Sequence, residues 1–138
     1  MADATLLRYQ QFYEDGYAIT MRRVQQGLVK NDRMVIGSEI DRYARVQLRD
    51  WLLNIEGIQE GPGQLIAVNR RLYDPKLSGA YRQPDVYIPG AKLIFDGTIA
   101  EKTGTLGQMV DFRRFSGGAN VVIVRPAAEG GSYGIIFR

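Results

Sequence analysis

The chain contains no cysteine and no histidine. Their absence excludes zinc sites built on thiolate or imidazole ligands, serine–histidine–aspartate triads, thiol nucleophiles and histidine acid–base pairs. The chemistry that remains is that of carboxylate, lysine, arginine, tyrosine and hydroxyl groups. Oxygen ligands of this kind favour hard metal ions such as Mg²⁺.

Long apolar runs are absent as well. No run approaches the roughly 18 residues of a membrane-spanning helix, and the N-terminus lacks the basic-then-apolar pattern of a secretion signal. We therefore expect no membrane span. If the protein is exported, we expect its delivery module to lie on a longer parent protein.

The composition is otherwise ordinary for a globular protein, with 45% apolar and 24% charged residues. A chain of 138 residues is long enough for one domain with its own core. The chain carries 18 Lys and Arg residues against 15 Asp and Glu residues, a net charge of +3. That excess is compatible with a polyanionic partner but does not require one. We expect a single domain over residues 1–138.

Helical spacing of apolar side chains dominates the first part of the chain. Residues 4–29 predict two short helices that are separated at Gly16. Ser38 has the position of an N-cap, with Asp41 three residues later as its capping-box partner. The apolar residues that follow recur every three or four positions until Gly57, which predicts a strong amphipathic helix.

Strand-like spacing dominates the second half. The expected elements are strands at residues 65–72, 86–88, 92–99 and 120–124, a loop at 74–83, a helix at 104–115 and an edge strand at 132–137. The strand–helix–strand connection predicts two parallel neighbouring strands. The expected fold is therefore α/β in the broad sense (α+β), with an N-terminal helical part at residues 1–37. A core with a mixed central β-sheet and one βαβ crossover follows at residues 38–138.

Two acids mark the predicted sheet. Asp85 opens one strand, and Asp96 interrupts the apolar run of the next, so that their carboxylates can converge. Such a pair repels itself unless a cation lies between its members or one member is protonated. A divalent cation held there would suit phosphodiester hydrolysis. The alternative is that Asp85 is a turn acid after Pro84, and that Asp96 and Gly97 mark a β-bulge without metal.

The order of these elements resembles that of the PD-(D/E)XK nuclease superfamily. In that superfamily an acid on the first helix, a proline–aspartate step and an acid on the next strand hold the metal, which matches Glu39, Asp85 and Asp96. The resemblance implies a restriction-endonuclease-like core, and Mg²⁺ or another divalent metal such as Mn²⁺ as cofactor. An acid in the first turn of a helix also complements the helix dipole without any metal, so the role of Glu39 stays open.

One motif departs from this pattern. The superfamily places a lysine two residues after the strand acid, where this chain has Thr98. Lys102 can supply the missing ammonium group from the following loop, and Gln108 is similar to the glutamine that some members carry on the next helix. The catalytic set that the resemblance implies is therefore Glu39, Asp85, Asp96, Thr98, Lys102 and Gln108.

The segment from Phe95 to Gln108 and the end of the chain also resemble the C-terminal toxin domains of contact-dependent inhibition and Rhs-type polymorphic toxins. That resemblance implies a DNase or tRNase that is secreted as part of a larger effector. It would act in the cytoplasm of the target cell, and a cognate immunity protein would neutralise it in the producer.

Four arginines are candidates to flank the predicted acid cluster. Arg70, Arg71, Arg82 and Arg113 are candidates to bind the phosphates of a nucleic acid, or they belong to an ordinary solvated surface. Two alternatives to a metal-dependent nuclease also remain. One is a metal-independent ribonuclease that uses Lys102, Arg113, Thr98 and a tyrosine, and the other is a non-catalytic interaction domain.

Overall fold

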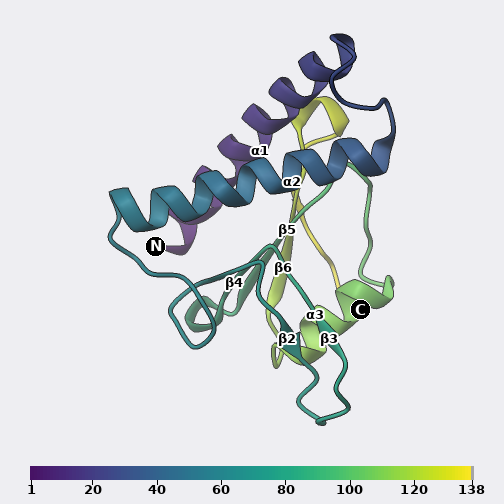
Figure 1. Ribbon diagram of the computed structural model, residues 1–138. Coiled ribbons are helices and arrows are strands. Elements are labelled where there is room, and N and C mark those ends of the chain that lie inside the picture. The colour runs from purple at the N-terminus through teal and green to yellow at the C-terminus, as the bar shows by residue number, and fades with distance from the viewer. Residues whose placement is uncertain (138) are drawn as a thin grey trace.

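In a computed structural model of the protein, which describes residues 1–137, two long helices pack on one face of a five-stranded sheet. A shorter helix packs on the other face. Figure 1 shows the two long helices crossing above the sheet, with the short helix far from them and near the C-terminus. The fold is a mixed α+β fold with its helices first and its mixed sheet second, as the sequence predicts.

Helix α1 (Ala2–Gln25) is continuous. The predicted break at Gly16 is wrong, because this glycine lies inside the helix where α1 crosses the next helix. A Cβ atom at Gly16 would lie 2.9 Å from Cδ1 of Tyr43, so the position needs a glycine for close helix packing. Glycine at this point in the chain therefore reflects a tertiary contact and not a helix end.

Helix α2 (Arg33–Asp50) begins five residues before the predicted N-cap at Ser38. Asp32 is the N-cap, and its Oδ1 accepts hydrogen bonds from the backbone N–H groups of Met34 at 3.0 Å and Val35 at 3.2 Å. The helix continues into a short π-helical segment, Trp51–Ile55. The expected division at residues 37 and 38 falls inside α2, and Asp41 lies in the helix interior, where it is not a capping residue.

The main sheet contains β1 (Ala67–Val68), β4 (Val86–Ile88), β5 (Leu93–Gly97), β6 (Asn120–Val124) and β7 (Tyr133–Gly134), in that spatial order. Strands β5 and β6 are parallel and are connected through α3 (Gly107–Phe115), while the other neighbouring pairs are antiparallel. The predicted parallel pair with its helical crossover is confirmed. Helix α3 begins three residues later than the sequence predicts.

One predicted strand is wrong. Residues 65–72 do not form a single strand, because Asn69 adopts a left-handed conformation with φ of 54° and turns the chain after β1. The chain then enters β2 (Leu72–Tyr73), which pairs with β3 (Tyr81–Arg82) in a separate two-stranded sheet. This small hairpin contacts α3.

The apolar core has two parts, one on each face of the sheet. Phe95 of β5 packs into the cluster made with α1 and α2, whereas its neighbour Ile94 packs into the cluster made with α3. This alternation is that of a strand buried on both faces. It directs Asp96 toward the face of α3 and Gly97 toward α1 at the carboxyl end of β5. No helix within residues 1–137 has both the length and the apolar character needed to cross a membrane.

Candidate active site

Asp96 lies near the carboxyl end of β5, and its residue is 5% exposed. Its Oδ2 atom is 2.8 Å from Nζ of Lys102, which comes from the loop after the strand. The same Nζ donates a hydrogen bond to Oε1 of Gln108, at 2.9 Å, near the start of α3. The structure therefore brings three of the predicted site residues into one hydrogen-bonded group.

Asp85 precedes β4, which runs antiparallel to β5, so Asp85 lies at the same end of the sheet as Asp96. Its residue is 6% exposed. Oδ2 of Asp85 accepts a hydrogen bond of 2.6 Å from the backbone N–H of Gly97, and Oδ1 is 3.3 Å from Nη1 of Arg45 on α2. Asp85 thus connects the end of the sheet, through Gly97, to α2, through Arg45.

Burial dominates the electrostatics of these acids. It raises the pKa of Asp85 well above its ordinary value, and the neighbouring charges of Asp96 and Asp41 raise it further. The Gly97 N–H and Arg45 oppose that shift. Burial also raises the pKa of Asp96, against the stabilising charge of Lys102. A desolvated carboxylate cluster of this kind gains stability from either a proton or an added cation.

Asp41 joins this group from α2, although the sequence analysis assigned it only a capping role. Its Oδ1 accepts a hydrogen bond of 2.6 Å from the hydroxyl group of Tyr13 on α1. Burial raises the pKa of Asp41 to about 6, while Tyr13 and Arg45 lower it. The negative charge of Asp96 also raises the pKa of Asp41, so the two acids interact electrostatically.

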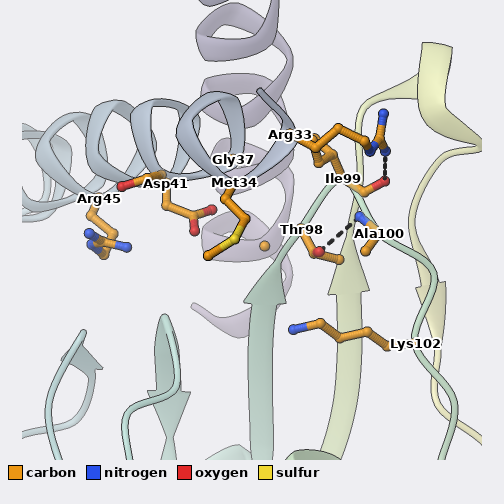
Figure 2. Close-up of a pocket in the computed structure, with 11 residues that line it drawn as sticks. Arg33, Met34, Gly37, Asp41, Arg45, Thr98, Ile99, Ala100 and Lys102 are labelled. Carbon is orange, nitrogen blue, oxygen red and sulfur yellow. Dashed lines mark hydrogen bonds between the residues drawn. The ribbon is translucent and has the colours of Figure 1, made fainter. Parts of the chain in front are cut away.

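A cavity of about 410 Å³ opens beside these residues. Its lining includes Asp41 and Arg45 from α2 and Thr98 and Lys102 from the end of the sheet. Figure 2 shows Asp41 and Arg45 extending from α2, and Lys102 reaching toward them from the opposite side. Arg33, at the first position of α2, lies at another part of the cavity wall. The cavity therefore combines one acid with several cationic groups.

Gly97 permits the close approach of α1 to the site. A Cβ atom at this position would overlap the ring of Tyr13 and lie 2.8 Å from Oη of Tyr9. Tyr9 is fully buried, and its hydroxyl group has no hydrogen-bond partner among residues 1–137. The glycine that follows Asp96 is therefore required by the packing of two tyrosines and is not a sign of a β-bulge: β5 and β6 stay in register through Gly97.

Glu39 does not lie with the other predicted acids. It precedes Asp41 by two residues, which turns its side chain about 200° around the helix. Its Oε2 atom is 2.7 Å from Nη2 of Arg42 and 4.0 Å from Nη1 of Arg23 on α1. The expected placement of Glu39 beside Asp85 is therefore wrong, and Asp41 is the acid of α2 that faces the cluster.

Thr98 lines the cavity at the place where the superfamily pattern has a lysine. Its backbone N–H donates to the carbonyl oxygen of Val124 at 3.0 Å, and its Oγ1 accepts a hydrogen bond from the backbone N–H of Ala100 at 2.9 Å. Thr98 thus stabilises the turn that leads from β5 toward Lys102. Its side chain is close to the site, but the ammonium group there belongs to Lys102.

The four arginines predicted to bind phosphate have other neighbours. Arg70 pairs with Glu60, Arg71 stacks on Tyr81, Arg82 pairs with Asp111, and Arg113 lies over the ring of Phe137. None of the four belongs to the cavity lining, and their binding of phosphate stays a prediction. The cationic lining consists instead of Arg33, Arg45 and Lys102.

The sequence of α2 contains a pattern that indicates Arg33, Asp41 and Arg45, which the sequence analysis did not assign to the site. Positions 33, 37, 41 and 45 recur every four residues and carry Arg, Gly, Asp and Arg. They follow one row of the helix beside the buried row at positions 36, 40, 44 and 48. A polar row directly beside a buried row marks side chains at the edge of the core, where charged groups are partly desolvated.

The donor set is compatible with a hard divalent cation. Asp85 and Asp96 supply carboxylate oxygens, and Mg²⁺ is often held by one or two carboxylates together with water and substrate phosphates. Burial raises the pKa of both acids, and a desolvated carboxylate is stabilised by a nearby cation. Among residues 1–137, no three acidic side chains lie close enough together to form a ready-made metal cage.

Comparisons of this chain with protein-family models, with curated proteins and with solved structures found no match. The chemistry of the site is therefore argued from its own residues. These are a buried pair of acids in contact with a lysine and an arginine, a glutamine beside the lysine, and an adjoining open cavity.

Proposed function

We propose that this protein is a metal-dependent nuclease that hydrolyses phosphodiester bonds in DNA or tRNA, and that its sheet and α2 form a restriction-endonuclease-like core. The observation that carries the proposal is the buried pair Asp85 and Asp96 at one sheet end, with Lys102 in contact with Asp96. In open α/β sheets, ligands bind outside the carboxyl ends of the strands, and this pair lies at such an end.

Asp85 and Asp96 are the residues that would hold Mg²⁺ or Mn²⁺. The chemistry that such a cation supplies when bound is activation of the attacking water and neutralisation of the charge that develops on the phosphate. The Gly97 N–H keeps one oxygen of Asp85 fixed, and Gln108 orients the amine of Lys102. The protein thus orients both carboxylates before substrate arrives.

The cavity residues suit a phosphodiester. Lys102 carries a positive charge beside Asp96, where it can position the attacking water or a phosphate oxygen. Arg45 and Arg33 supply further positive charge for the substrate backbone. Asp41, with a pKa raised to about 6, can accept a proton near neutral pH.

The biological setting of the proposal follows the resemblance to polymorphic toxin domains. In that setting the nuclease is an antibacterial toxin domain of a larger secreted effector, and it acts in the cytoplasm of the target cell. A cognate immunity protein blocks it in the producing cell. The small net charge of +3 is compatible with both partners, nucleic acid and protein.

The test is incubation of the purified protein with plasmid DNA and with total tRNA, each with Mg²⁺ and with EDTA. The Asp96→Asn variant should lose cleavage, and the Asp50→Asn variant should keep it. Asp50 is a matched control because it is an exposed acid of α2 outside the cavity, in contact with Asn54. Absence of cleavage of both substrates under all conditions would contradict the nuclease proposal and favour the interaction domain.

A second candidate, a metal-independent ribonuclease, is favoured by one observation. The charges of Asp85 and Asp96 already have cationic partners in Arg45 and Lys102. In this mechanism Asp41 removes the proton of the RNA 2′-hydroxyl group, and Lys102 stabilises the phosphate. This enzyme would cleave RNA in EDTA, leave 2′,3′-cyclic phosphate ends and leave DNA intact, whereas the metal-dependent enzyme would be inactive in EDTA.

A further inference from the structure

The hydroxyl group of Tyr133 contacts both backbone polar groups of Lys102. The Lys102 N–H donates to Oη of Tyr133 at 2.6 Å, and the Tyr133 O–H donates to the Lys102 carbonyl oxygen at 2.7 Å. One side-chain atom thus acts as acceptor and donor to the same residue, 31 positions away in the sequence. We call this pair of hydrogen bonds the Tyr133 clamp.

Lys102 needs such a support because no regular element holds it. It lies between β5 and α3, in a segment without helix or strand, six residues after the acid that it contacts. A lysine on β5 itself would be oriented by the pleat of the strand. In the observed arrangement, the position of Nζ depends on the path of a loop, and loops are intrinsically more mobile than the elements that they connect.

The clamp connects this loop to the sheet. Tyr133 belongs to β7 and pairs with Ile123 of β6, and β6 pairs in turn with β5, which carries Asp96. The ring of Tyr133 also packs against the apolar cluster beneath α3. Strand pairing and ring packing therefore hold Tyr133 in place, and its hydroxyl group anchors the backbone from which the Lys102 side chain extends.

We propose that Tyr133 is a positioning residue, which holds Lys102 in contact with Asp96 and Gln108. Its kinetic consequence rests on the proposed nuclease function, whereas the placement of Lys102 does not. Removal of the hydroxyl group in Tyr133→Phe leaves the ring packing intact and releases the loop backbone. Lys102 then spends less time beside Asp96 and more time in solvent.

Tyr87→Phe is the matched control. Tyr87 of β4 packs against the same apolar cluster and is partly buried like Tyr133. Within residues 1–137 the hydroxyl group of Tyr87 makes no hydrogen bond to Lys102, whose backbone instead contacts Tyr133. A general effect of losing a tyrosine hydroxyl near this cluster would appear in both variants, whereas loss of the clamp would appear in one.

The first readout is the reactivity of each lysine with a water-soluble amine-acylating reagent, measured by mass spectrometry after brief labelling. The Lys102 side chain is 19% exposed, and exposed lysines at positions 30, 76 and 92 serve as references in the same sample. In Tyr133→Phe we expect Lys102 to react several times faster, with the reference lysines and the Tyr87→Phe protein unchanged. Unchanged Lys102 reactivity in Tyr133→Phe would overturn the proposal.

The second readout is a double-mutant cycle in cleavage activity. Tyr133→Phe should lower kcat on the order of tenfold to a hundredfold, because displacement of a catalytic group by about 1 Å has effects of this size. In a Lys102→Met background the same change should have no further effect, since Lys102 is the residue through which it acts. Equal losses in both backgrounds would assign Tyr133 a general structural role and overturn the proposal.

The two readouts separate this inference from the proposed function. Faster labelling of Lys102 without any nuclease activity in the parent protein would support the clamp and contradict the nuclease. Normal activity with a cycle that is additive would support the nuclease and contradict the clamp. The labelling experiment needs neither metal nor substrate, so it can be interpreted by itself.

Discussion

The two acids of α2, Asp41 and Glu39, are two residues apart and have opposite surroundings. Asp41 contacts Tyr13, lines the cavity and has a pKa raised by burial to about 6. Glu39 pairs with Arg42 and Arg23 on another side of the helix. The comparison shows that the phase of a helix, more than the type of residue, decides which acid faces the cavity.

Substitution of Asp96 should have the largest effect on cleavage, against which the effects at Asp41 and Glu39 can be compared. Asp96→Asn should lower cleavage by roughly a thousandfold or more, because it removes one of the two carboxylates that would hold the cation. The asparagine keeps the size of the side chain and can still accept the hydrogen bond from Lys102. Initial rates on plasmid DNA or tRNA, with circular dichroism to verify folding, provide the measurement. If Asp96→Asn retained more than a tenth of the activity, Asp96 would not be a ligand of the catalytic cation.

Two substitutions on α2 test the difference between Asp41 and Glu39 directly. Asp41→Asn should lower cleavage by about 100-fold, the lower end of the usual size of an acid–base contribution. Glu39→Gln should change it by less than about twofold, since exposed ion pairs of this kind contribute little. Both rates are measured under the same conditions. The opposite order of effects would show that the helix acid of the superfamily pattern is Glu39 after all.

Packing around Gly97 provides a comparison of stability. Gly97→Ala should destabilise the protein by about 2 to 3 kcal/mol, because the added methyl group overlaps Tyr13 and approaches Tyr9. Gly37→Ala on α2 should be neutral or stabilising by up to about 1 kcal/mol, since its nearest neighbour would be Ile99 at 3.9 Å. Urea unfolding of the two variants measures both values. Similar stability of the two proteins would mean that α1 does not pack tightly on Gly97.

The smallest expected effect is a change in the pH dependence of stability. The pKa of Asp41 is raised from 3.8 to about 6 on folding, so the folded state binds more protons than the unfolded state between these pH values. The contribution of Asp41 to stability is therefore present below pH 3.8 and is lost as the pH rises through 6. Asp41→Asn should remove this loss and raise stability at pH 7 by about 1 to 2 kcal/mol.

Unfolding curves of Asp41→Asn and the parent protein at pH 4 and pH 7 test that expectation. The gain at pH 7 relative to pH 4 should occur in Asp41→Asn and be absent in Glu39→Gln, whose carboxylate pairs with Arg42. A stabilised but less active Asp41→Asn protein would fit an acid that is retained for function at a cost to stability. Equal pH profiles of the variant and the parent would contradict the burial of Asp41.

Much of the sheet could be predicted from the sequence, since its signals are local. The runs at residues 86–88 and 120–124 are short and rich in valine and isoleucine, and they are strands in the structure. The convergence of Asp85 with Asp96 follows from the antiparallel pairing of adjacent strands. The contact between Lys102 and Asp96 follows from the short loop that separates them.

The predictions from sequence were wrong where tertiary contacts override the local preference of a residue. Gly16 has the local character of a helix breaker, but the packing of Tyr43 against it explains the glycine. Ser38 and Asp41 match a capping box, but Asp32 caps the same helix six residues before Ser38. The resemblance assigned the helix acid to Glu39, whereas Asp41 is the acid of α2 that lines the cavity. The contacts of Arg71 and Arg82 depend on the hairpin of β2 and β3, whose two-residue strands are too short to show a periodic pattern.

The most direct test of the site is to find where on the protein a divalent cation binds. Mn²⁺ added in small amounts to ¹⁵N-labelled protein broadens the amide resonances nearest to it. The account predicts broadening centred on Gly97 and Asp85, with the resonances of Glu39 and Arg42 much less affected, and loss of the effect in Asp96→Asn. Broadening centred on Glu39 and Arg42, or no localised broadening at all, would contradict the proposal that Asp85 and Asp96 form a metal site.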